Sequence, residues 1–231
     1  MQEPARLVLA IALAVIVAYL IGSISFSIIF TELFDKKDIR EMGSGNAGMT
    51  NVLRSAGMKP GVLTTICDFG KGIVACLLGA VIFSAVLGGS DGLAIWGWGT
   101  EPYRYGTYVA GIGCILGHMF PIFFGFRGGK GVLTTAAVLL MIYPPILAVD
   151  FSLFLILALA TKYVSLGSIM AAATFPLWGW LFNYFVFYKA GAVSLQYMLL
   201  AVMGACVVAK HHANIGRLIH HTEKKFTLHH D

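Results

Sequence analysis

Long apolar stretches alternate with short polar segments along the chain. A helix needs about 20 apolar residues to cross the hydrocarbon core of a bilayer, which is about 30 Å thick. Stretches of that length cover residues 7–31, 60–90, 105–126, 131–161, 163–188 and 190–209. Pro144 and Pro145 divide the fourth stretch into two short spans, because proline removes a backbone donor and clashes with the preceding turn. The pattern predicts an all-α, polytopic membrane protein with seven transmembrane helices, or six if the proline pair forms a re-entrant turn.

The composition supports a chain embedded in lipid. Hydrophobic residues make up 58% of the 231 positions and charged residues only 12%, whereas a globular chain averages about 25% charged residues. So few charges do not cover a water-facing exterior. A secretory signal is the alternative for 7–31, but this run is much longer than the apolar region of a signal peptide, about 7 to 15 residues. We expect the whole chain, 1–231, to form a single integral-membrane domain.

The basic residues indicate how the chain is oriented. Of the 16 Lys and Arg residues, the seven-span topology puts twelve on one side and three on the other, with Lys71 inside a helix. The positive-inside rule then places the N-terminus outside and the C-terminus in the cytoplasm, an orientation that seven spans satisfy and six do not. The net charge of +5 is thereby assigned to orientation and to anionic ligands, and no nucleic-acid partner is predicted.

The cysteines do not indicate a metal site. They lie scattered through apolar segments, without a Cys-x-x-Cys pair or a nearby His at metal-ligand spacing. We expect them to be buried small hydrophobic side chains. They are Cys67, Cys76, Cys114 and Cys206.

Four polar segments gather on one side of the predicted topology. They follow the first, third, fifth and seventh spans and cover 41–54, 117–131, 162–168 and the start of the C-terminal segment 210–231. The outer connections, among them 88–104, carry no comparable cluster. One composite site that faces the cytoplasm is the simplest interpretation.

The first polar segment has the composition of an anion-binding loop. Gly43, Gly45 and Gly48 allow successive backbone N–H groups to turn toward one centre. Neighbouring side chains add hydrogen-bond donors and, at the last position, a charged fork. They are Ser44, Asn46, Thr50, Asn51 and Arg54. We predict phosphate binding here, with a flexible interfacial loop as the alternative.

The second polar segment repeats this logic at the start of a helix. Gly128, Gly129 and Gly131 surround Lys130, which lies beside the positive N-terminus of the helix that follows. The segment lacks the four-residue gap and the Ser or Thr of a Walker A motif, so ATP is not predicted. A positive-inside anchor is the alternative. Two further candidates lie nearby, Arg127 and His118, of which His118 is either a base or a hydrogen-bonded structural residue.

Near the C-terminus, His211, Asn214 and Arg217 are spaced at i, i+3 and i+6. His211 and Asn214 are thus expected on one face of a helix, with Arg217 nearby. A solvated C-terminal helix is the alternative interpretation. The His-rich end of the chain is a weaker candidate for metal binding.

Charged residues within the apolar stretches need partners. A lone charge at mid-bilayer costs at least about 2.5 to 3.5 kcal/mol. Asp68 and Lys71, at i and i+3, are expected to neutralise each other. Asp150 is expected either near an interface or paired across helices.

In chain order, these motifs resemble the bacterial acyl-phosphate:glycerol-3-phosphate acyltransferase (PlsY) family. The resemblance extends over residues 15–223 and rests on four colinear motifs, which are far more specific together than singly. They are Gly43-Ser44-Gly45-Asn46 with Thr50-Asn51, Gly117-His118 with Pro121 and Gly128-Gly129-Lys130-Gly131, Tyr163-Val164-Ser165 with Ser168, and His211 with Asn214 and Arg217. Met49, Arg127 and His221 depart from the usual family pattern, but none of these changes removes a charged contact.

The resemblance implies an enzyme that transfers a fatty acyl group from acyl phosphate to glycerol 3-phosphate, forming lysophosphatidic acid and inorganic phosphate. It implies catalytic roles for Ser44, Asn46, Lys130, His211 and Asn214. The expected phosphate contacts come from Gly43, Ser44, Gly45, Asn46, Thr50, Asn51, Arg54, Gly128, Gly129, Lys130, Ser165, Ser168 and Arg217. It implies no metal and no cofactor. The expected partners are the two substrates, membrane lipid and the enzyme that makes acyl phosphate, at the bacterial inner membrane.

The chemistry of an acyl phosphate favours a substrate-assisted mechanism. Because phosphate is a good leaving group, positioning of the glycerol hydroxyl and stabilisation of the oxyanion matter more than a strong base. The departing phosphate is expected to take the proton, with His211 as the rival base. Ser44 is not favoured as an acyl-enzyme nucleophile, since its motif shows no His or acid arranged to activate it.

Two other classes of protein are less well supported. The His-x4-Asp motif of another glycerolipid acyltransferase class does not occur in the sequence. A transporter of small organic anions tends to show repeated halves and broken helices at mid-membrane, whereas the polar segments here gather at one face. A membrane scaffold gives no reason for the glycine-rich loops.

Overall fold

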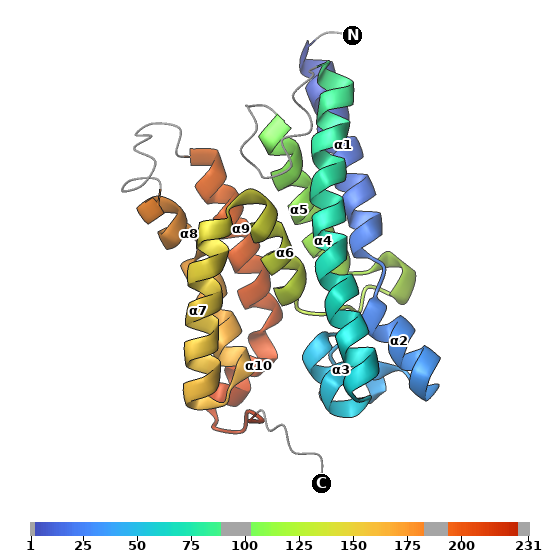
Figure 1. The fold of residues 1–231 in the computed structure, drawn as a ribbon, viewed down its shortest axis with the longest axis vertical. Helices are drawn as coiled ribbons and strands as arrows, with labels where there is room; N and C mark the ends of the chain where they lie inside the picture. Colours follow the sequence, from blue (N-terminus) through green and yellow to red (C-terminus); the bar gives the residue numbers. More distant parts are fainter. Residues whose placement is uncertain (1–2, 89–102, 183–193, 226–231) are drawn as a thin grey trace. The chain divides into compact units, whose positions relative to one another are not determined.

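In a computed structural model of the chain, residues 3–88, 103–182 and 194–225 are described, and every regular element among them is a helix (Figure 1). The predicted all-α class is confirmed for this part of the chain. The chain divides into two compact units, Met1–Tyr143 and Pro144–Asp231. Their boundary falls at the predicted proline break, and the single-domain organisation stays a prediction.

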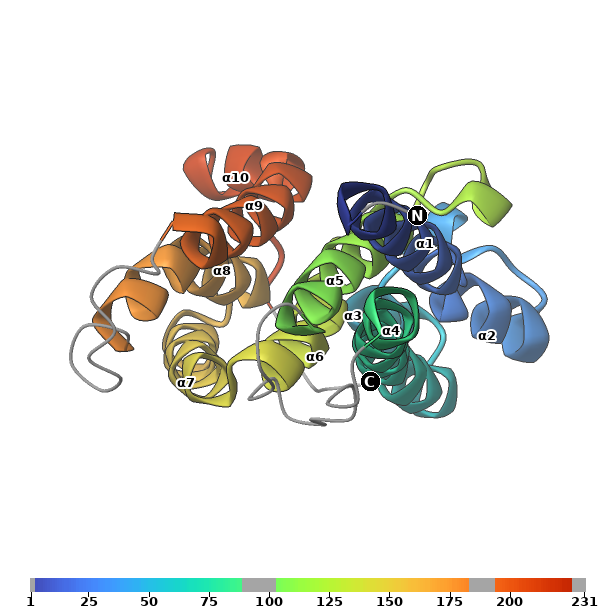
Figure 2. The same cartoon turned by 90° about the horizontal axis from the view of Figure 1, so that it is seen from above.

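The first unit is built on three long helices, α1 (Glu3–Gly22), α4 (Met58–Leu87) and α5 (Tyr103–Met119). Each packs against the other two, and they lie side by side in both views (Figures 1 and 2). Their backbones approach closely, because a Cβ at Gly22 would collide with the backbone carbonyl of Cys114 on α5. Within a bilayer, such close van der Waals packing at small residues holds helices together.

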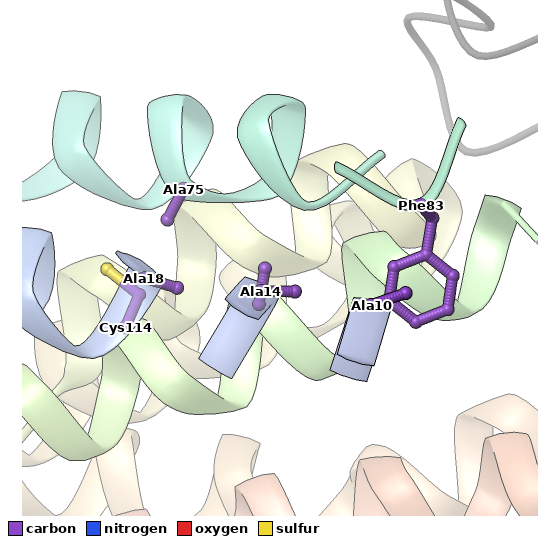
Figure 3. Close-up of a cluster of buried hydrophobic side chains, with 7 residues drawn as sticks. Ala10, Ala14, Ala18, Ala75, Phe83 and Cys114 are labelled. Carbon is purple, nitrogen blue, oxygen red and sulfur yellow. The ribbon is translucent and has the colours of Figure 1, made fainter. Parts of the chain in front are cut away.

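A buried seam, made of small side chains and one phenylalanine, fills the centre of this three-helix unit (Figure 3). Alanines at every fourth position line the buried face of α1 and meet residues of α4 and α5. The seam consists of Ala10, Ala14, Ala18, Ala75, Phe83, Ala110 and Cys114. Other faces of α1 expose Val8 and Ile16, as expected for a helix that meets lipid. Cys76 and Cys114 are buried as predicted, whereas Cys67 and Cys206 are half-buried.

The first predicted span, 7–31, is not one continuous helix. α1 ends at Gly22, and α2 (Phe26–Asp35) begins after Ser25. Serine hydroxyls compete with the helical backbone bonds, and Ser25 Oγ lies 3.2 Å from Ser27 Oγ. The break leaves the carbonyl oxygen of Ile24 outside any helical ladder, and a side chain from α4 donates to it.

Short elements carry the polar segments of the first unit. The 3-10 helix η1 (Ile39–Glu41) and α3 (Met49–Ser55) enclose the first loop. The 3-10 helix η2 (Ile122–Phe124) lies in the second loop, and α6 (Val132–Ile142) follows that loop. Helix α6 packs against α4 and α5.

The second unit contains α7 (Pro144–Thr161), α8 (Val164–Phe182), α9 (Ser194–Lys210) and α10 (His212–Ile219). Helix α8 packs against both α7 and α9 (Figure 1). Asp150 on α7 is buried and accepts a hydrogen bond of 3.2 Å from Thr174 Oγ1 on α8. Of the two placements expected for Asp150, near an interface or paired across helices, the contact with Thr174 agrees with the second, and the partner is a hydroxyl.

The described helices agree with a polytopic membrane protein. Five segments are long and apolar enough to cross a bilayer, or six if the bent α9–α10 pair counts as one span. The predicted fourth span is α6, whose 11 residues extend only about 16 Å at 1.5 Å each. The count of seven and the orientation of the termini therefore stay predictions. The predicted outer connection 88–104 and Lys189 lie almost wholly outside the described residues.

Candidate active site

The first polar loop is held in a defined shape by its glycines. Gly43 and Gly45 have φ angles of 58° and 70°, in the left-handed region that favours glycine. A Cβ at Gly43 would also collide with the side chains of Asn51 and Ser55. Ser44 is exposed on the loop, and Arg54 is exposed on α3, the helix that follows it. It is therefore an ordered turn with two of the predicted phosphate ligands at its surface.

Asn51 connects the two ends of this loop. Its side-chain oxygen accepts hydrogen bonds from Ser44 N (2.9 Å) and from Ser55 Oγ (3.3 Å). Its amide nitrogen, which has two N–H donors, lies within 3.2 Å of three backbone carbonyl oxygens, those of Ile39, Met42 and Asn46. Both ends of the amide thus bind the loop itself, and the side chain is buried. Asn51 organises the loop, and its predicted contact with phosphate stays a prediction.

A partly exposed ion pair between Asp38 and Arg40 joins the first loop to the second. Arg40 donates to both carboxylate oxygens of Asp38 and also to the carbonyl oxygen of Phe124, at 2.7 Å. Hydrogen bonds from Arg40 hold the pKa of Asp38 below its usual value, against an opposing effect of burial. The sequence does not reveal the role of Arg40, because the Phe124 carbonyl that it binds lies 84 residues further along the chain.

The second polar loop folds back on the end of α5. The N–H of Gly129 donates to the carbonyl of His118 over 3.1 Å. A Cβ at Gly129 would collide with His118 Nε2 and with the carbonyl oxygen of Ala47. The structure therefore brings the two glycine-rich loops into contact at Gly129 and Ala47, as a shared anion site requires.

Lys130 lies where the sequence predicts, at the start of a helix. It is half-buried, and it precedes Gly131, the residue before α6. The first-turn N–H groups of a helix and a nearby ammonium both favour an anion. Arg127 is exposed on the same loop. The predicted Gly128–Gly131 residues and Lys130 thus belong to one helix entrance.

A buried cluster lies beneath these loops. Lys71 forms an ion pair of 2.7 Å with Asp68, as predicted. Lys71 Nζ also lies 3.0 Å from His118 Nδ1, a link that the sequence does not reveal. His118, which the sequence leaves open between base and structural residue, is buried and hydrogen-bonded.

In the second unit, His211 lies at a sharp bend between α9 and α10. The two helices make an angle of 59°, and His211 is the residue just before α10. Its Nδ1 lies 2.7 Å from the carbonyl oxygen of Val207. Because a carbonyl only accepts, Nδ1 carries the proton, and the lone pair of the neutral ring is on Nε2. The ring is 2% exposed, so its orientation is fixed by packing as well.

Three predicted site residues converge on a carboxylate that the sequence analysis left without a role. Ser165 Oγ and Asn214 Nδ2 each donate to Glu223 Oε1 over 2.6 Å, and Arg217 Nε donates to Oε2 over 2.7 Å. Burial raises the pKa of Glu223, but the hydrogen bonds from these three side chains outweigh it, and the pKa falls below its usual value. The cluster ties α8, α10 and the segment after α10 together.

The predicted residues are thus grouped within each unit. The first unit brings the Gly43–Arg54 and Gly128–Gly131 residues together, and the second brings Ser165, Asn214 and Arg217 together. Ser168 lies buried on α8, where its hydroxyl donates to the carbonyl of Val164. His211 is the N-cap of α10 and its carbonyl accepts from Ile215 N over 2.9 Å, while Asn214 lies within the helix; that the two side chains share one helix face stays a prediction. A single composite site formed by both units stays a prediction.

Comparisons with known proteins point to one family. A family model described as glycerol-3-phosphate acyltransferase matches residues 12–221. A glycerol-3-phosphate acyltransferase of Finegoldia magna is 38% identical over 210 residues, covering 91% of this chain and 93% of the relative. Glycerol-3-phosphate acyltransferase 2 of Bacillus anthracis is 37% identical over 213 residues, covering 92% and 97%.

Two solved structures are similar over nearly the whole chain. Both are crystal structures of PlsY, an integral membrane glycerol 3-phosphate acyltransferase, at 34% sequence identity. The glycerol 3-phosphate form has a TM-score of 0.75 and covers 94% of this chain and 96% of that one. The lysophosphatidic acid form has a TM-score of 0.73. The predicted integral-membrane class is thereby confirmed.

Proposed function

This chain belongs to the glycerol-3-phosphate acyltransferase family, and we propose that it takes its fatty acyl group from an acyl phosphate, releasing inorganic phosphate and forming lysophosphatidic acid. The observation that carries the proposal is the contact of two glycine-rich loops at Gly129 and Ala47. Both substrates of this reaction carry a phosphate, so two anionic groups must be held close together. Adjacent loops rich in backbone N–H groups, with cations beside them, suit that requirement.

The first unit supplies the proposed phosphate contacts. Exposed Ser44 and Arg54 and half-buried Lys130 offer a hydroxyl, a planar fork and an ammonium. The loop backbones provide further donors. The proposed contact residues of this unit are Gly43, Ser44, Gly45, Asn46, Thr50, Asn51, Arg54, Gly128, Gly129 and Lys130, with Arg127 as a further candidate.

The proposed reaction is a direct acyl transfer. A glycerol hydroxyl oxygen attacks the acyl carbonyl carbon, the bond from that carbon to the phosphate oxygen breaks, and the hydroxyl proton passes to the departing phosphate. Donors from Ser44, Asn46 and Lys130 stabilise the charge that develops at the carbonyl oxygen and on the leaving phosphate. No acyl-enzyme is formed, so the enzyme contributes positioning more than base strength.

The second unit supplies the remaining proposed residues. Val207 fixes the tautomer of His211, so the Nε2 lone pair is the rival acceptor for the hydroxyl proton. Asn214, Ser165, Ser168 and Arg217 complete the proposed set. Glu223 holds three of these four side chains in place through its hydrogen bonds.

The proposed setting follows from the chemistry of the substrates. Homologues that are integral membrane proteins and several apolar helices indicate a bacterial membrane protein. We place it in the inner membrane with its loops facing the cytoplasm. Glycerol 3-phosphate is water-soluble and reaches the loops from the cytoplasm, whereas the acyl chain of the donor stays in the bilayer. The acyl-phosphate-producing enzyme is the proposed protein partner. The proposed reaction uses no metal, no cofactor and no nucleic acid.

A reconstituted assay tests this function. Purified protein in lipid vesicles receives glycerol 3-phosphate with palmitoyl phosphate or, separately, with palmitoyl-CoA. Lysophosphatidic acid from palmitoyl phosphate alone is the expected result, and Lys130→Ala abolishes it. Lys59→Ala, an exposed lysine at the start of α4, is the matched control and retains activity.

Two outcomes would contradict the proposal. Product from palmitoyl-CoA and none from palmitoyl phosphate would assign a different donor. Uptake of labelled glycerol 3-phosphate into sealed vesicles, without any lipid product from folded protein, would indicate transport instead.

A further inference from the structure

Three ionisable side chains of the first unit are buried together. The exposed fractions of Asp68, Lys71 and His118 are 1%, 4% and 6%. The proposed acyl transfer assigns none of them a contact with substrate. A buried ion pair is weak evidence for stability, because replacing both partners by apolar residues is often neutral or stabilising. The presence of this pair therefore calls for another explanation.

Lys71 joins three helices at one point. Its Nζ lies 2.7 Å from Asp68 Oδ1 on α4, 2.9 Å from the Ile24 carbonyl oxygen at the α1–α2 break, and 3.0 Å from His118 Nδ1 on α5. An ammonium group donates and has no acceptor, so the Ile24 carbonyl and His118 Nδ1 accept its hydrogen bonds, and the Asp68 carboxylate is its ion-pair partner. The side chain is thus held in one orientation.

This arrangement determines the state of the histidine ring. The ammonium only donates, so Nδ1 of His118 accepts, and the neutral ring carries its proton on Nε2. Asp68 Oδ1 also lies 3.6 Å from this Nδ1, but it is paired with Lys71 at 2.7 Å. One carboxylate balances one cation, and a protonated ring would place a second cation 3.0 Å from the first. In a low-dielectric interior, that repulsion is large. The ion pair therefore fixes both the tautomer and the orientation of His118.

The other edge of the ring faces the two loops. A Cβ at Gly129 would collide both with Nε2 of His118 and with the carbonyl oxygen of Ala47. The backbone of His118 also holds Gly129 through the hydrogen bond from the Gly129 N–H. His118 thus contacts the second loop through both its ring and its backbone. The contact is at Gly129, next to Ala47 of the first loop.

We propose that Asp68 and Lys71 are positioning residues: they hold the His118 ring, and the ring sets how the glycine-lysine loop at Gly129 lies against the first loop at Ala47. This inference rests on the proposed function in that it assigns both loops to phosphate binding. The positioning of the loop by His118 is present in the protein without substrate. It extends from the helix break at Ile24, through Lys71 and His118, to the loop that carries Lys130.

The test replaces the ion pair as a unit. Asp68→Asn/Lys71→Met removes both charges and leaves neither partner alone in the membrane. Thr64→Val is the matched control, because Thr64 is fully buried on the same face of α4, one turn before Asp68. Hydrogen exchange of residues 125–131 is measured without substrate, next to the thermal unfolding temperature and the kcat and KM values for both substrates.

The double variant is expected to unfold at the wild-type temperature or above it. The amides of Gly129 and Lys130 exchange at least about fivefold faster, and KM for a phosphorylated substrate rises roughly tenfold, while kcat changes less than about threefold. Thr64→Val leaves exchange and KM unchanged. Unchanged exchange and KM in a folded double variant would overturn the proposal, as would a loss confined to kcat.

A second variant tests whether the pair acts through the ring. His118→Asn keeps an acceptor for Lys71 near the Nδ1 position but lacks the edge that reaches Gly129. Combining it with the double substitution is expected to give the same exchange and KM as His118→Asn alone, whereas additive effects would exclude a common path. Should the double variant fail to fold, exchange in His118→Asn carries the test by itself. Faster exchange in protein that makes no product from acyl phosphate would refute the proposed function and retain the positioning role.

Discussion

The side-chain oxygen of Asn51 accepts a hydrogen bond of 2.9 Å from the backbone N–H of Ser44, seven residues earlier. The two N–H donors of the same side chain are shared among three carbonyls of the surrounding loop, all within 3.2 Å of the amide nitrogen. A single buried amide therefore closes the first glycine-rich loop. The loop, which carries the exposed Ser44 side chain, can thus keep its shape before any anion arrives.

Asn51→Asp is expected to disorder this loop. The carboxylate has no N–H to donate to the surrounding carbonyls, and a buried polar group left without a partner costs about 1 to 3 kcal/mol. We expect kcat/KM to fall by about a hundredfold. Ser55→Ala is the control, because it removes only one bond of 3.3 Å. Steady-state kinetics and hydrogen exchange of 42–51 check the prediction, and equal effects of both substitutions would contradict it.

Gly129→Ala is expected to separate the two loops. Its methyl group would require space held by His118 Nε2 and by the Ala47 carbonyl, and a backbone atom cannot rotate away. We expect a loss of about a hundredfold in kcat/KM. Gly70→Ala, which meets nothing within 4 Å on α4, should retain activity and gain up to about 1 kcal/mol of stability. Enzyme assays and unfolding temperatures decide between these outcomes.

The Glu223 carboxylate is expected to give the second unit an acid-sensitive stability. Its pKa lies below the usual 4.5, because hydrogen bonds from Ser165, Asn214 and Arg217 outweigh the effect of burial. The lowered pKa means that this stabilisation is complete above pH 4.5 and is lost as pH falls through the folded-state pKa. Glu223→Gln should therefore lower the unfolding temperature at pH 7, and the difference from wild type should shrink in acid.

Unfolding scans of both proteins between about pH 3 and 7 measure this difference. Glu32→Gln, an exposed glutamate on α2, controls for the change in net charge. A difference that stays constant with pH would show that the carboxylate is not ionised in the cluster.

His211 distinguishes the two proton acceptors. If the departing phosphate takes the proton, His211→Gln retains a polar group near Nε2 and loses less than about a hundredfold in kcat. If His211 is the base, both His211→Gln and His211→Ala lose several orders of magnitude in kcat at unchanged substrate affinity. His212→Ala, an exposed neighbour, is the control. Measured kcat and KM values separate the two mechanisms.

The membrane class, the helical segments and the two glycine-rich loops could be predicted because each depends on neighbouring residues. Apolar runs long enough to cross a bilayer, the Pro144-Pro145 break and the Gly128–Gly131 helix entrance are local patterns. The Asp68–Lys71 pair was also predictable, because an i, i+3 spacing brings two side chains together on any helix. Local spacing is sufficient where backbone geometry alone sets the distance.

Only the tertiary structure decided which polar groups meet across the sequence. Lys71 reaches His118 and Glu223 reaches Ser165 over separations of 47 and 58 residues, which no local period encodes. The break of the first span at Ser23–Ser25 was missed for a related reason. An apolar run by itself fits a continuous helix, and the hydrogen bond from Lys71 to the Ile24 carbonyl at the break is visible only in the folded chain. Buried polar groups must be satisfied by whatever the fold brings near them, so their partners follow from packing and not from the order of residues.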